Sequence, residues 1–356
     1  MQTQYRIIGM MSGTSLDGMD LVYAVFQFKG TWHFTIEAAQ SFSYSKPWQN
    51  ILRSIHKISE AERNKHENDY VQLIAKTVRQ FCETHGIHHV DALCSHGHTV
   101  FHEPEKGITY QMGNRFELAQ LLGFTVVCDF RTQDVAMGGQ GAPLVPIGDA
   151  KLFHQYNACL NLGGFANVSF TENQQTIAFD IGAVNTVLNG LALKIGQPFD
   201  QDGELARKGK RIAALWNRLE EIEYYQRPYP KSLGIEWVAE ILAPILFDFE
   251  HHPVEDVMAT YTEHISNEIG KQLNPTHKVL VSGGGAKNTY LIEQIQKHTK
   301  ATLFIPDEKI IDFKEALIFG FLGVLRLRGE VNCLASVTGA HYDHSSGNIF
   351  YPQKLK

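Results

Sequence analysis

The stretch Gly9–Asp20, which reads GMMSGTSLDGMD, lies between two segments of strand-like composition. An apolar run over Tyr5–Met11 leads into it, and Leu21–Phe28 follows it with Val, Phe and Tyr. A turn of Gly, Ser and Thr between two strands is an economical anion site, because glycines let backbone N–H groups approach a ligand. We therefore expect a phosphate-binding loop, with a polar hairpin tip that binds nothing as the alternative.

The side chains of this turn suit a nucleotide and its metal ion. The hydroxyl groups of Ser12, Thr14 and Ser15 add donors for phosphate oxygens. Asp17 and Asp20 cannot ligate phosphate themselves, and their natural use is to hold Mg²⁺, directly or through water. The turn matches neither GxxxxGK[ST] nor GxGxxG, so it supports neither a P-loop nor a Rossmann fold.

Length and composition describe an ordinary globular protein. A chain of 356 residues favours two domains, and 44% hydrophobic with 20% charged residues is typical of soluble proteins. The net charge of −6 and the lack of a basic block argue against nucleic acid as a partner. The five cysteines form no CxxC pair, and no segment reads as a signal peptide or membrane span. We expect a cytoplasmic protein without membrane contact.

The second half of the chain repeats the plan of a strand, a glycine turn and a strand. A predicted strand over 158–162 leads into Gly163 and Gly164, and a strand resumes after Asn167. The repeat at about half the chain length predicts two topologically similar halves.

A third glycine-rich turn, Gly283–Gly285, follows a predicted strand over 278–281 and precedes Asn288 and a helix. Bare backbone at a helix N-terminus suits the ribose and base of a nucleotide, and a turn without ligand is the alternative. Three such turns with acidic residues nearby are the arrangement of a two-domain phosphotransferase that closes on ATP and a small substrate.

Phosphoryl transfer also needs one carboxylate that orients or deprotonates the nucleophile. Asp180 is the best candidate, because we expect it at the end of a strand over 176–180, beside a glycine. The alternative is an aspartate that caps the next turn.

The segment Ser95–Thr99, SHGHT, carries two histidines that would point to the same side of a regular strand. A metal site is one reading, but no acidic or Cys ligand lies nearby at a usual zinc spacing. We favour His96 and His98 as polar residues that line a sugar or phosphate site. The Gly- and Pro-rich segment around Gln140 and Gly141 is either a linker or a loop on which a ligand rests.

Ten motifs then carry a family resemblance. In chain order they are MMSGTSLDGMD, SHGHTVFH, DFRTQDVAMGGQGAPLVP, NLGGFANV, FDIGAVN, DQDGELARKG, YPKSLG, VSGGGAKN, EALIFGFL and SVTGA, over about residues 7–341. The chain resembles the anhydro-N-acetylmuramic acid kinases of the actin-like, sugar-kinase ATPase superfamily. The resemblance implies an α/β fold of two ribonuclease-H-like domains with mixed sheets around a central cleft. We expect an N-terminal lobe of residues 1–131 and 336–356 and a C-terminal lobe of residues 132–335.

The resemblance also implies an ATP-dependent reaction in cell-wall recycling. Water opens the 1,6-anhydro ring of anhydro-N-acetylmuramic acid while O6 takes the γ-phosphate, which gives N-acetylmuramic acid 6-phosphate. Asp180 matches the family's catalytic base. The expected cofactors are ATP and Mg²⁺, and the expected assembly is a homodimer. The expected nucleotide contacts are Ser12, Gly13, Thr14, Ser15, Leu16, Asp17, Gly18, Met19, Asp20, Gly163, Gly164, Asn167, Gly283, Gly284, Gly285 and Asn288, and the expected sugar contacts are His96, His98, Gln140, Gly141, Asn185 and Glu315.

Four motifs depart from the family pattern, all on the expected sugar side. The usual FDTGPGN reads FDIGAVN over 179–185, SHGQT has His98 in place of Gln, KSTGRE reads KSLGIE over 231–236, and Phe-His is Gly148-Asp149. Two alternatives therefore stay open beside the anhydro-sugar kinase. One is a kinase of the same fold that acts on an ordinary amino-sugar hydroxyl, and the other is a catalytically weak, nucleotide-dependent sugar sensor.

Overall fold

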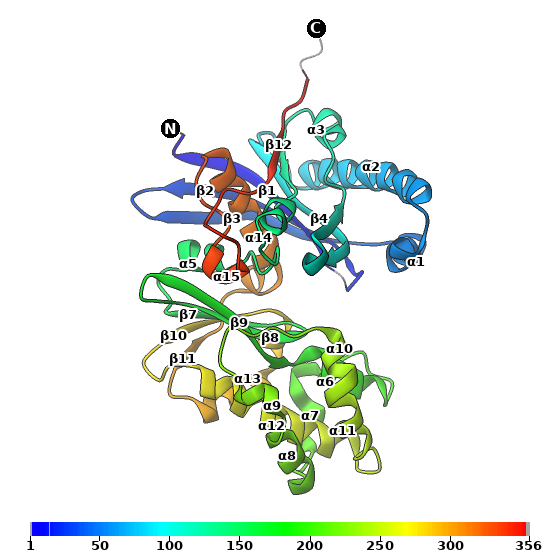
Figure 1. The fold of residues 1–356 in the computed structure, drawn as a ribbon, viewed down its shortest axis with the longest axis vertical. Coiled ribbons are helices and arrows are strands. Elements are labelled where there is room, and N and C mark those ends of the chain that lie inside the picture. The colour runs from blue at the N-terminus through cyan, green and yellow to red at the C-terminus, as the bar shows by residue number, and fades with distance from the viewer. Residues whose placement is uncertain (1, 14, 354–356) are drawn as a thin grey trace. The chain divides into compact units, whose positions relative to one another are not determined.

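A computed structural model describes residues 2–13 and 15–353 of the chain (Figure 1). The chain forms two compact units. Unit 1 comprises Met1–Leu152 and Phe313–Lys356, and unit 2 comprises Phe153–Asp312.

These boundaries differ from the expected ones at 131/132 and 335/336. The segment after residue 131 stays with unit 1 because it is bonded to the end of the chain: the N–H of Gln140 donates to the carbonyl of Thr338 at 2.8 Å. Further along, Nζ of Lys314 lies 2.8 Å from Oδ1 of Asp149. The Gly- and Pro-rich segment is therefore a loop of unit 1 and does not mark the junction of the two units.

Unit 1 is built on a mixed sheet in which three antiparallel strands precede parallel ones. β1 pairs with β2 and β2 with β3 antiparallel, whereas β4 runs parallel to β1 and β6 parallel to β4. The order is β12-β6-β4-β1-β2-β3, with β5 on β4. The strands are β1 (Gln4–Ser12), β2 (Gly18–Phe28), β3 (Trp32–Ser43), β4 (Ala92–Glu103), β5 (Ile108–Met112), β6 (Thr125–Cys128) and β12 (Asn348–Phe350).

Helix α2 (Glu60–His85) covers one face of this sheet and packs on Ile8, Met10 and Leu93. Ser59 and Glu62 form a capping box at its start, and Gly86 ends it in the left-handed conformation. α1 (Lys46–Ser54) and η1 (Ile55–Lys57) precede it in the chain.

Helix α14 (Glu308–Leu327) lies against the opposite face of the sheet in unit 1. Glycines permit this close packing: the Cα atom of Gly9 lies 3.4 Å from the position that a Cβ on Gly320 would occupy. A Cβ on Gly9 would lie 2.1 Å from the carbonyl oxygen of Ala316. The remaining helices of unit 1 are η2 (Pro104–Lys106), α3 (Glu117–Leu122), α4 (Thr132–Ala136), α5 (Pro146–Leu152) and α15 (Ala335–Thr338).

Unit 2 repeats the strand topology of unit 1 in the order β11-β10-β7-β8-β9. β7, β8 and β9 form an antiparallel meander, β10 runs parallel to β7, and β11 parallel to β10. The shared topology confirms the predicted α/β class with two ribonuclease-H-like units and mixed sheets. The strands are β7 (Ala158–Leu162), β8 (Phe165–Glu172), β9 (Gln175–Ala183), β10 (Lys278–Ser282) and β11 (Thr302–Phe304).

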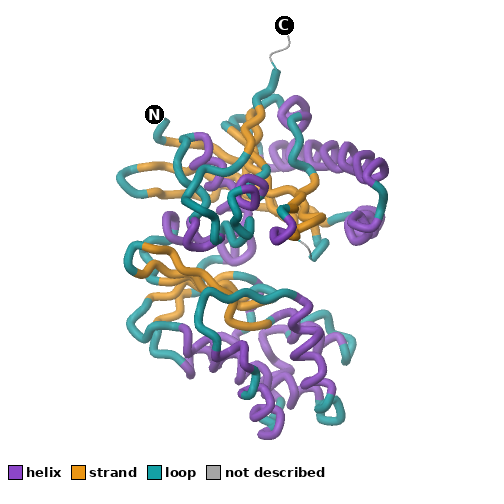
Figure 2. The backbone as a smooth tube through the Cα atoms, viewed as in Figure 1, coloured by secondary structure: helices purple, strands orange, loops and turns teal. Residues whose placement is uncertain are grey.

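The longest helix of unit 2, α12 (Val254–Gln272), packs on β9, and its buried Tyr261 donates to the carbonyl of Ala183 at 2.8 Å. Figure 2 shows the other helices of unit 2 in purple. They are α6 (Asn185–Leu193), η3 (Gln201–Gly203), α7 (Glu204–Lys208), α8 (Ala213–Glu220), α9 (Glu223–Gln226), α10 (Ile235–Trp237), η4 (Val238–Leu242), α11 (Ala243–Phe247), η5 (Gly284–Lys287) and α13 (Thr289–His298).

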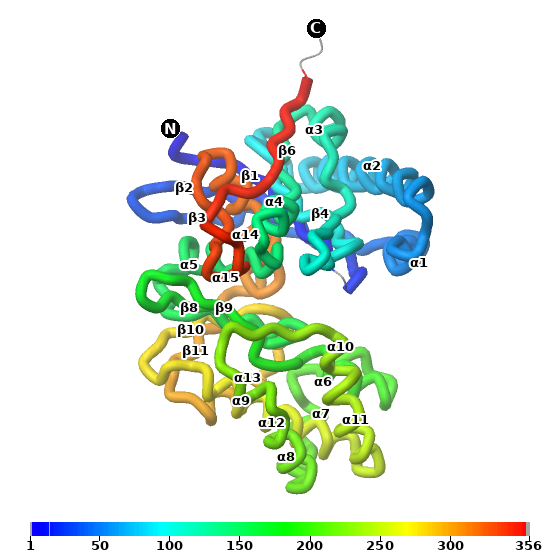
Figure 3. The backbone as a smooth tube through the Cα atoms, viewed as in Figure 1, coloured from blue at the N-terminus to red at the C-terminus, as the bar shows by residue number. Residues whose placement is uncertain are grey.

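The C-terminal segment returns to the first sheet, where β12 pairs antiparallel with β6 (Figure 3). All five cysteines are free thiols. Among the described residues, no helix has the length and apolar character needed to cross a bilayer.

Candidate functional site

The glycine turn of unit 1 is shorter than predicted, because the strands on both sides extend into it. β1 runs to Ser12 and β2 begins at Gly18, so Met19 and Asp20 lie within a strand. Ser15 and Asp17 are exposed, and Leu16 has a positive φ of 62°. Thr14 lies outside the described residues.

The hydroxyl of Ser12 is fixed by a buried chain of hydrogen bonds. Its Oγ lies 2.7 Å from the hydroxyl of Tyr44 and 3.0 Å from Nδ1 of His98, and the hydroxyls of Tyr44 and Tyr70 are 2.6 Å apart. Burial raises the pKa of Tyr44 to about 12 and lowers the pKa of His98 to about 4, so both groups are neutral near pH 7. These hydrogen bonds hold the end of β1 in one geometry.

The two candidate Mg²⁺ ligands of this turn differ in their surroundings. Asp17 is exposed, whereas Asp20 is half-buried and its Oδ1 accepts a hydrogen bond of 2.5 Å from the hydroxyl of Ser41. Both are hard carboxylate oxygens at the turn, which is the donor type that Mg²⁺ requires. The residues fit the ion.

The prediction that His96 and His98 point the same way is wrong. The His96 ring packs on Phe319 of α14, whereas the His98 ring lies against Tyr70 of α2. The cause is Gly97, which has φ +75° at an irregularity in the pairing of β1 with β4. Such a bulge inserts one residue and reverses the side on which the following residues project. The whole motif lies inside β4.

Arg131 joins several of the predicted sugar residues, although the sequence did not mark it as a site residue. Its Nε donates to Nε2 of His96 at 2.8 Å, and its Nη1 donates to the carbonyl of Gly141 at 2.5 Å. Burial and the Arg131 charge hold the pKa of His96 well below its usual range, so the imidazole stays neutral. The position of Arg131, shortly after buried β6 in the motif DFRTQD, was the available signal.

Gln140, Gly141 and Glu315 gather around the same arginine in unit 1. The N–H of Gly141 donates to Oδ2 of Asp134 at 2.7 Å, and the Gln140 side chain is exposed. Glu315 is also exposed to solvent on α14, and its charge interacts with Arg131 and Asp20. Unit 1 therefore brings four of the six predicted sugar residues together around Arg131, whereas His98 points toward Ser12.

In unit 2, the two other glycine turns lie side by side. A Cβ on Gly283 would lie 2.7 Å from Oδ1 of Asn161 and 2.9 Å from the carbonyl oxygen of Leu162, so this position tolerates only glycine without a shift. Asn185, the sixth predicted sugar residue, donates from Nδ2 to the carbonyl of Leu162 at 3.1 Å. Its side chain thus contacts the backbone of the β7 end.

The turn after β7 also receives the start of α6. The carbonyl of Gly164 accepts from the N–H of Val184 at 2.8 Å, and the carbonyl of Gly163 accepts from the N–H of Asn185 at 3.3 Å. Gly164 and Gly284 are exposed, whereas Gly285 is buried. Asn288 caps α13 by accepting from the N–H of Leu291 at 2.9 Å, a structural use of that side chain.

We predicted that Asp180 ends its strand, and this is wrong. Asp180 lies inside β9, opposite Asn167. The strand continues to Ala183 past an irregularity in its pairing with β8. The Asp180 Oδ2 accepts a hydrogen bond of 2.9 Å from the N–H of Leu233, and its carbonyl accepts one of 2.7 Å from the hydroxyl of Tyr224. Burial raises the pKa of Asp180, and the bond from Leu233 opposes this shift.

The family model for anhydro-N-acetylmuramic acid kinase matches residues 5–352. The chain belongs to the anhydro-N-acetylmuramic acid kinase family. It is 33% identical to the Vibrio cholerae anhydro-N-acetylmuramic acid kinase, with 97% of this chain and 98% of the relative covered. It is 34% identical to the Gloeobacter violaceus protein of the same name, with 94% and 95% covered. By family, therefore, the chain is a phosphotransferase with an alcohol group as acceptor.

Among solved structures, the matches include a ROK family glucokinase from Streptomyces griseus in complex with glucose and AMPPNP. Its TM-score is 0.40 at 13% identity, with 89% of this chain and 98% of that chain covered. The fold assignment rests instead on the strand order of the two sheets.

Proposed function

We propose that this protein uses ATP to open the anhydro ring of 1,6-anhydro-N-acetylmuramic acid with water and to phosphorylate O6, which yields N-acetylmuramic acid 6-phosphate for cell-wall recycling. The observation that carries the proposal is a family match over residues 5–352 in a chain whose Asp180 is a half-buried carboxylate with a raised pKa. A general base with these properties is suited to activate a water molecule.

Asp180 is the proposed base. A water molecule attacks the anomeric carbon and gives its proton to the carboxylate of Asp180, while the bond from the anomeric carbon to O6 breaks. The electron pair stays on O6, which then takes the γ-phosphoryl group as ADP leaves. The N–H of Leu233 holds one carboxylate oxygen at 2.9 Å and so fixes the direction in which the other can accept a proton.

The nucleotide contacts are proposed from the glycine turns of each unit. In unit 1, backbone groups of the Ser12–Asp20 turn bind phosphate oxygens, and Asp17 and Asp20 hold Mg²⁺, which neutralises phosphate charge when bound. In unit 2, the bare backbone of Gly283–Gly285 supports adenosine, next to Gly163 and Gly164. Because the Ser12 hydroxyl is already fixed by hydrogen bonds, its side chain loses little conformational entropy when the nucleotide binds.

The sugar contacts of unit 1 are proposed around Arg131. The guanidinium group donates hydrogen bonds to His96 and to the carbonyl of Gly141. Gln140 and Glu315 are exposed beside it. An arginine with a neutral imidazole and a carboxylate offers both donors and acceptors to a lactyl carboxylate and to sugar hydroxyls. In unit 2, Asn185 is the proposed sugar contact.

Substrate profiling tests the proposal. ADP release is measured with Mg·ATP and either anhydro-N-acetylmuramic acid or N-acetylmuramic acid, which lacks the bridge. We expect ADP release with the bridged sugar alone. Equal rates with both sugars would instead favour the kinase of an ordinary hydroxyl, and ATP binding without sugar-dependent ADP release would favour the sensor. A homodimer in the cytoplasm completes the proposal, and size-exclusion chromatography with light scattering tests the assembly.

A further inference from the structure

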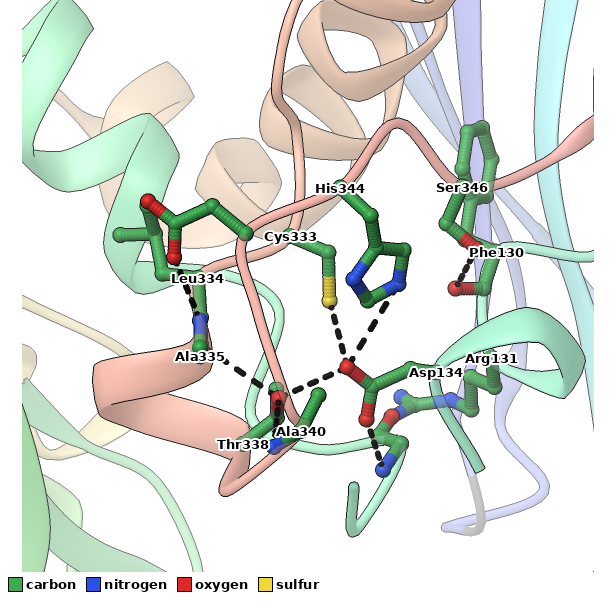
Figure 4. Close-up of polar contacts among 12 residues, drawn as sticks. Phe130, Arg131, Asp134, Cys333, Leu334, Ala335, Thr338, Ala340, His344 and Ser346 are labelled. Carbon is green, nitrogen blue, oxygen red and sulfur yellow. Dashed lines mark hydrogen bonds and ion pairs between the residues drawn. The ribbon is translucent and has the colours of Figure 1, made fainter. Parts of the chain in front are cut away.

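Unit 1 contains a buried group of metal-ligating side chains that the kinase reaction does not use. Oδ1 of Asp134 lies 3.0 Å from Sγ of Cys333 and 3.6 Å from Nε2 of His344 (Figure 4). The ligand atoms of all three residues lie within 4.8 Å of one another. They come from α4 and from two stretches of the C-terminal segment, so a cross-link among them would join distant parts of the chain.

One buried nitrogen atom of this group lacks a hydrogen-bond partner among the described residues. Asp134, Cys333 and His344 are 0%, 1% and 6% exposed, and Nε2 of His344 has no hydrogen-bond partner among the described residues. Its Nδ1 lies 3.1 Å from the carbonyl of Tyr342 and is placed to donate to it, which leaves a lone pair on Nε2 that faces the carboxylate. Two acceptor atoms that face each other in the protein interior are costly without a shared proton or cation.

We propose that Asp134, Cys333 and His344 bind a Zn²⁺ ion. One carboxylate oxygen, one sulfur and one imidazole nitrogen form a mixed donor set that suits zinc. In tetrahedral zinc sites the ligand atoms lie roughly 3.3 to 3.7 Å apart. The distances of 3.0 and 3.6 Å from Asp134 therefore need only a small rearrangement.

The charges also balance. On binding, the Cys333 thiol loses its proton to solvent, and the thiolate and the Asp134 carboxylate together offset the two charges of the ion. Arg131 interacts with both groups and opposes a further cation, although Glu315 partly offsets its charge.

The fourth tetrahedral position falls to water or to the hydroxyl of Thr338, whose Oγ1 lies 2.7 Å from Oδ1 of Asp134. Residues 341–343, which directly precede His344, are exposed. Oδ2 of Asp134 meanwhile keeps its bond to the N–H of Gly141. A bound ion would thus tie the Gln140–Gly141 loop to the end of the chain.

A second group of possible ligands, Glu220, His264 and Glu268 of unit 2, makes a poorer site. Nζ of Lys271 already lies 2.6 Å from Oε1 of Glu268, so a cation occupies the place that an ion would take. Glu220 is also exposed, which weakens its hold on a ligand.

Metal binding to the chelator-treated full-length protein tests the proposal without ATP or sugar, so its failure leaves the proposed kinase reaction untouched. Wild type is expected to retain one equivalent of zinc after dialysis, and Co²⁺ in its place should give a sulfur-to-cobalt charge-transfer band. Cys333→Ser should lose the band and bind zinc at least tenfold more weakly, and His344→Gln should bind it more weakly and keep a band. Cys82→Ser, which changes a half-buried thiol elsewhere, should match wild type.

Zinc should also raise the melting temperature of wild type but not that of Cys333→Ser, because a ligand that binds only the native state stabilises it. Because each protein is compared with its own zinc-free state, the test also works for a variant that is less stable than wild type. Failure of wild type to retain zinc would overturn the proposal, as would an unchanged cobalt band in Cys333→Ser.

Discussion

The carboxylate of Asp180 accepts a hydrogen bond from the backbone N–H of Leu233 at 2.9 Å, and this bond ties the middle of β9 to the loop before α10. The loop carries the altered motif KSLGIE, and the strand carries the altered motif FDIGAVN. The two departures from the family pattern therefore meet at one carboxylate. Because a backbone group makes the contact, neither altered side chain removes it.

Asp180→Asn should lower kcat by about a hundred- to ten-thousandfold, the range over which general base catalysis usually contributes. ATP affinity should stay within a few-fold of wild type, because an asparagine can still accept the Leu233 bond and keeps the shape of the strand. Turnover and ATP titration measure the two effects. The matched control is Asp248→Asn, which changes an exposed aspartate of the same unit and should keep full activity. Substantial turnover by Asp180→Asn would remove the proposed role of the residue.

The raised pKa of Asp180 also predicts a pH dependence of stability. Burial raises the folded pKa above the ordinary value of 3.8, so the native state favours the neutral acid. The contribution of Asp180 to the free energy of unfolding is fully present below its pKa in the unfolded chain. It is lost as the pH rises through its pKa in the folded protein. Asp180→Asn should therefore melt at a temperature at least equal to that of wild type near pH 7, and the difference should shrink toward pH 4. Differential scanning calorimetry across this range measures it, and a lower melting temperature of the variant near pH 7 would contradict the cause given for the shift.

Gln is the usual family residue at position 98, and His98→Gln should preserve the contact with Ser12 because an amide can also bond its hydroxyl. His98→Leu should cost about 1–3 kcal/mol of unfolding free energy and raise the KM for ATP, since the Ser12 hydroxyl loses one of its two buried partners. Urea unfolding and ATP kinetics check these outcomes. Equal KM values for His98→Leu and wild type would show that the fixed hydroxyl is not used by the nucleotide.

Gly9→Ala should destabilise unit 1 by about 1–3 kcal/mol, because the added Cβ would meet the carbonyl of Ala316 and push α14 from the sheet. Gly190→Ala in α6 is the matched control, since its Cβ would enter open space. We expect the control to gain about 0.5–1 kcal/mol from helix propensity. Thermal melting of both variants measures the contrast, and equal melting temperatures would show that α14 can shift freely.

The sequence was most informative where a local pattern decides the outcome. The glycine turns and the repeat of strand, turn and strand in the second half depend on short-range chemistry, and the structure has them. Side-chain direction was less predictable. The opposite directions of His96 and His98 follow from a bulge at Gly97, which depends on the pairing of β4 with β1.

The predicted site was incomplete for a similar reason. Arg131 and Asp134 are single charged residues without periodicity, and only the tertiary structure shows that they hold His96, Gly141 and Thr338. The place of Asp180 inside β9 was missed because its strand continues past an irregularity rather than stopping at the glycine that follows.

Mass spectrometry of the sugar product tests the central claim most directly. The protein is incubated with ATP, Mg²⁺ and anhydro-N-acetylmuramic acid, and the mass of the product is compared with that of the substrate. We predict a gain of one water and one phosphoryl group together, with no product from Asp180→Asn. A product that gains only the phosphoryl group, or an unchanged sugar alongside bound ATP, would contradict the account.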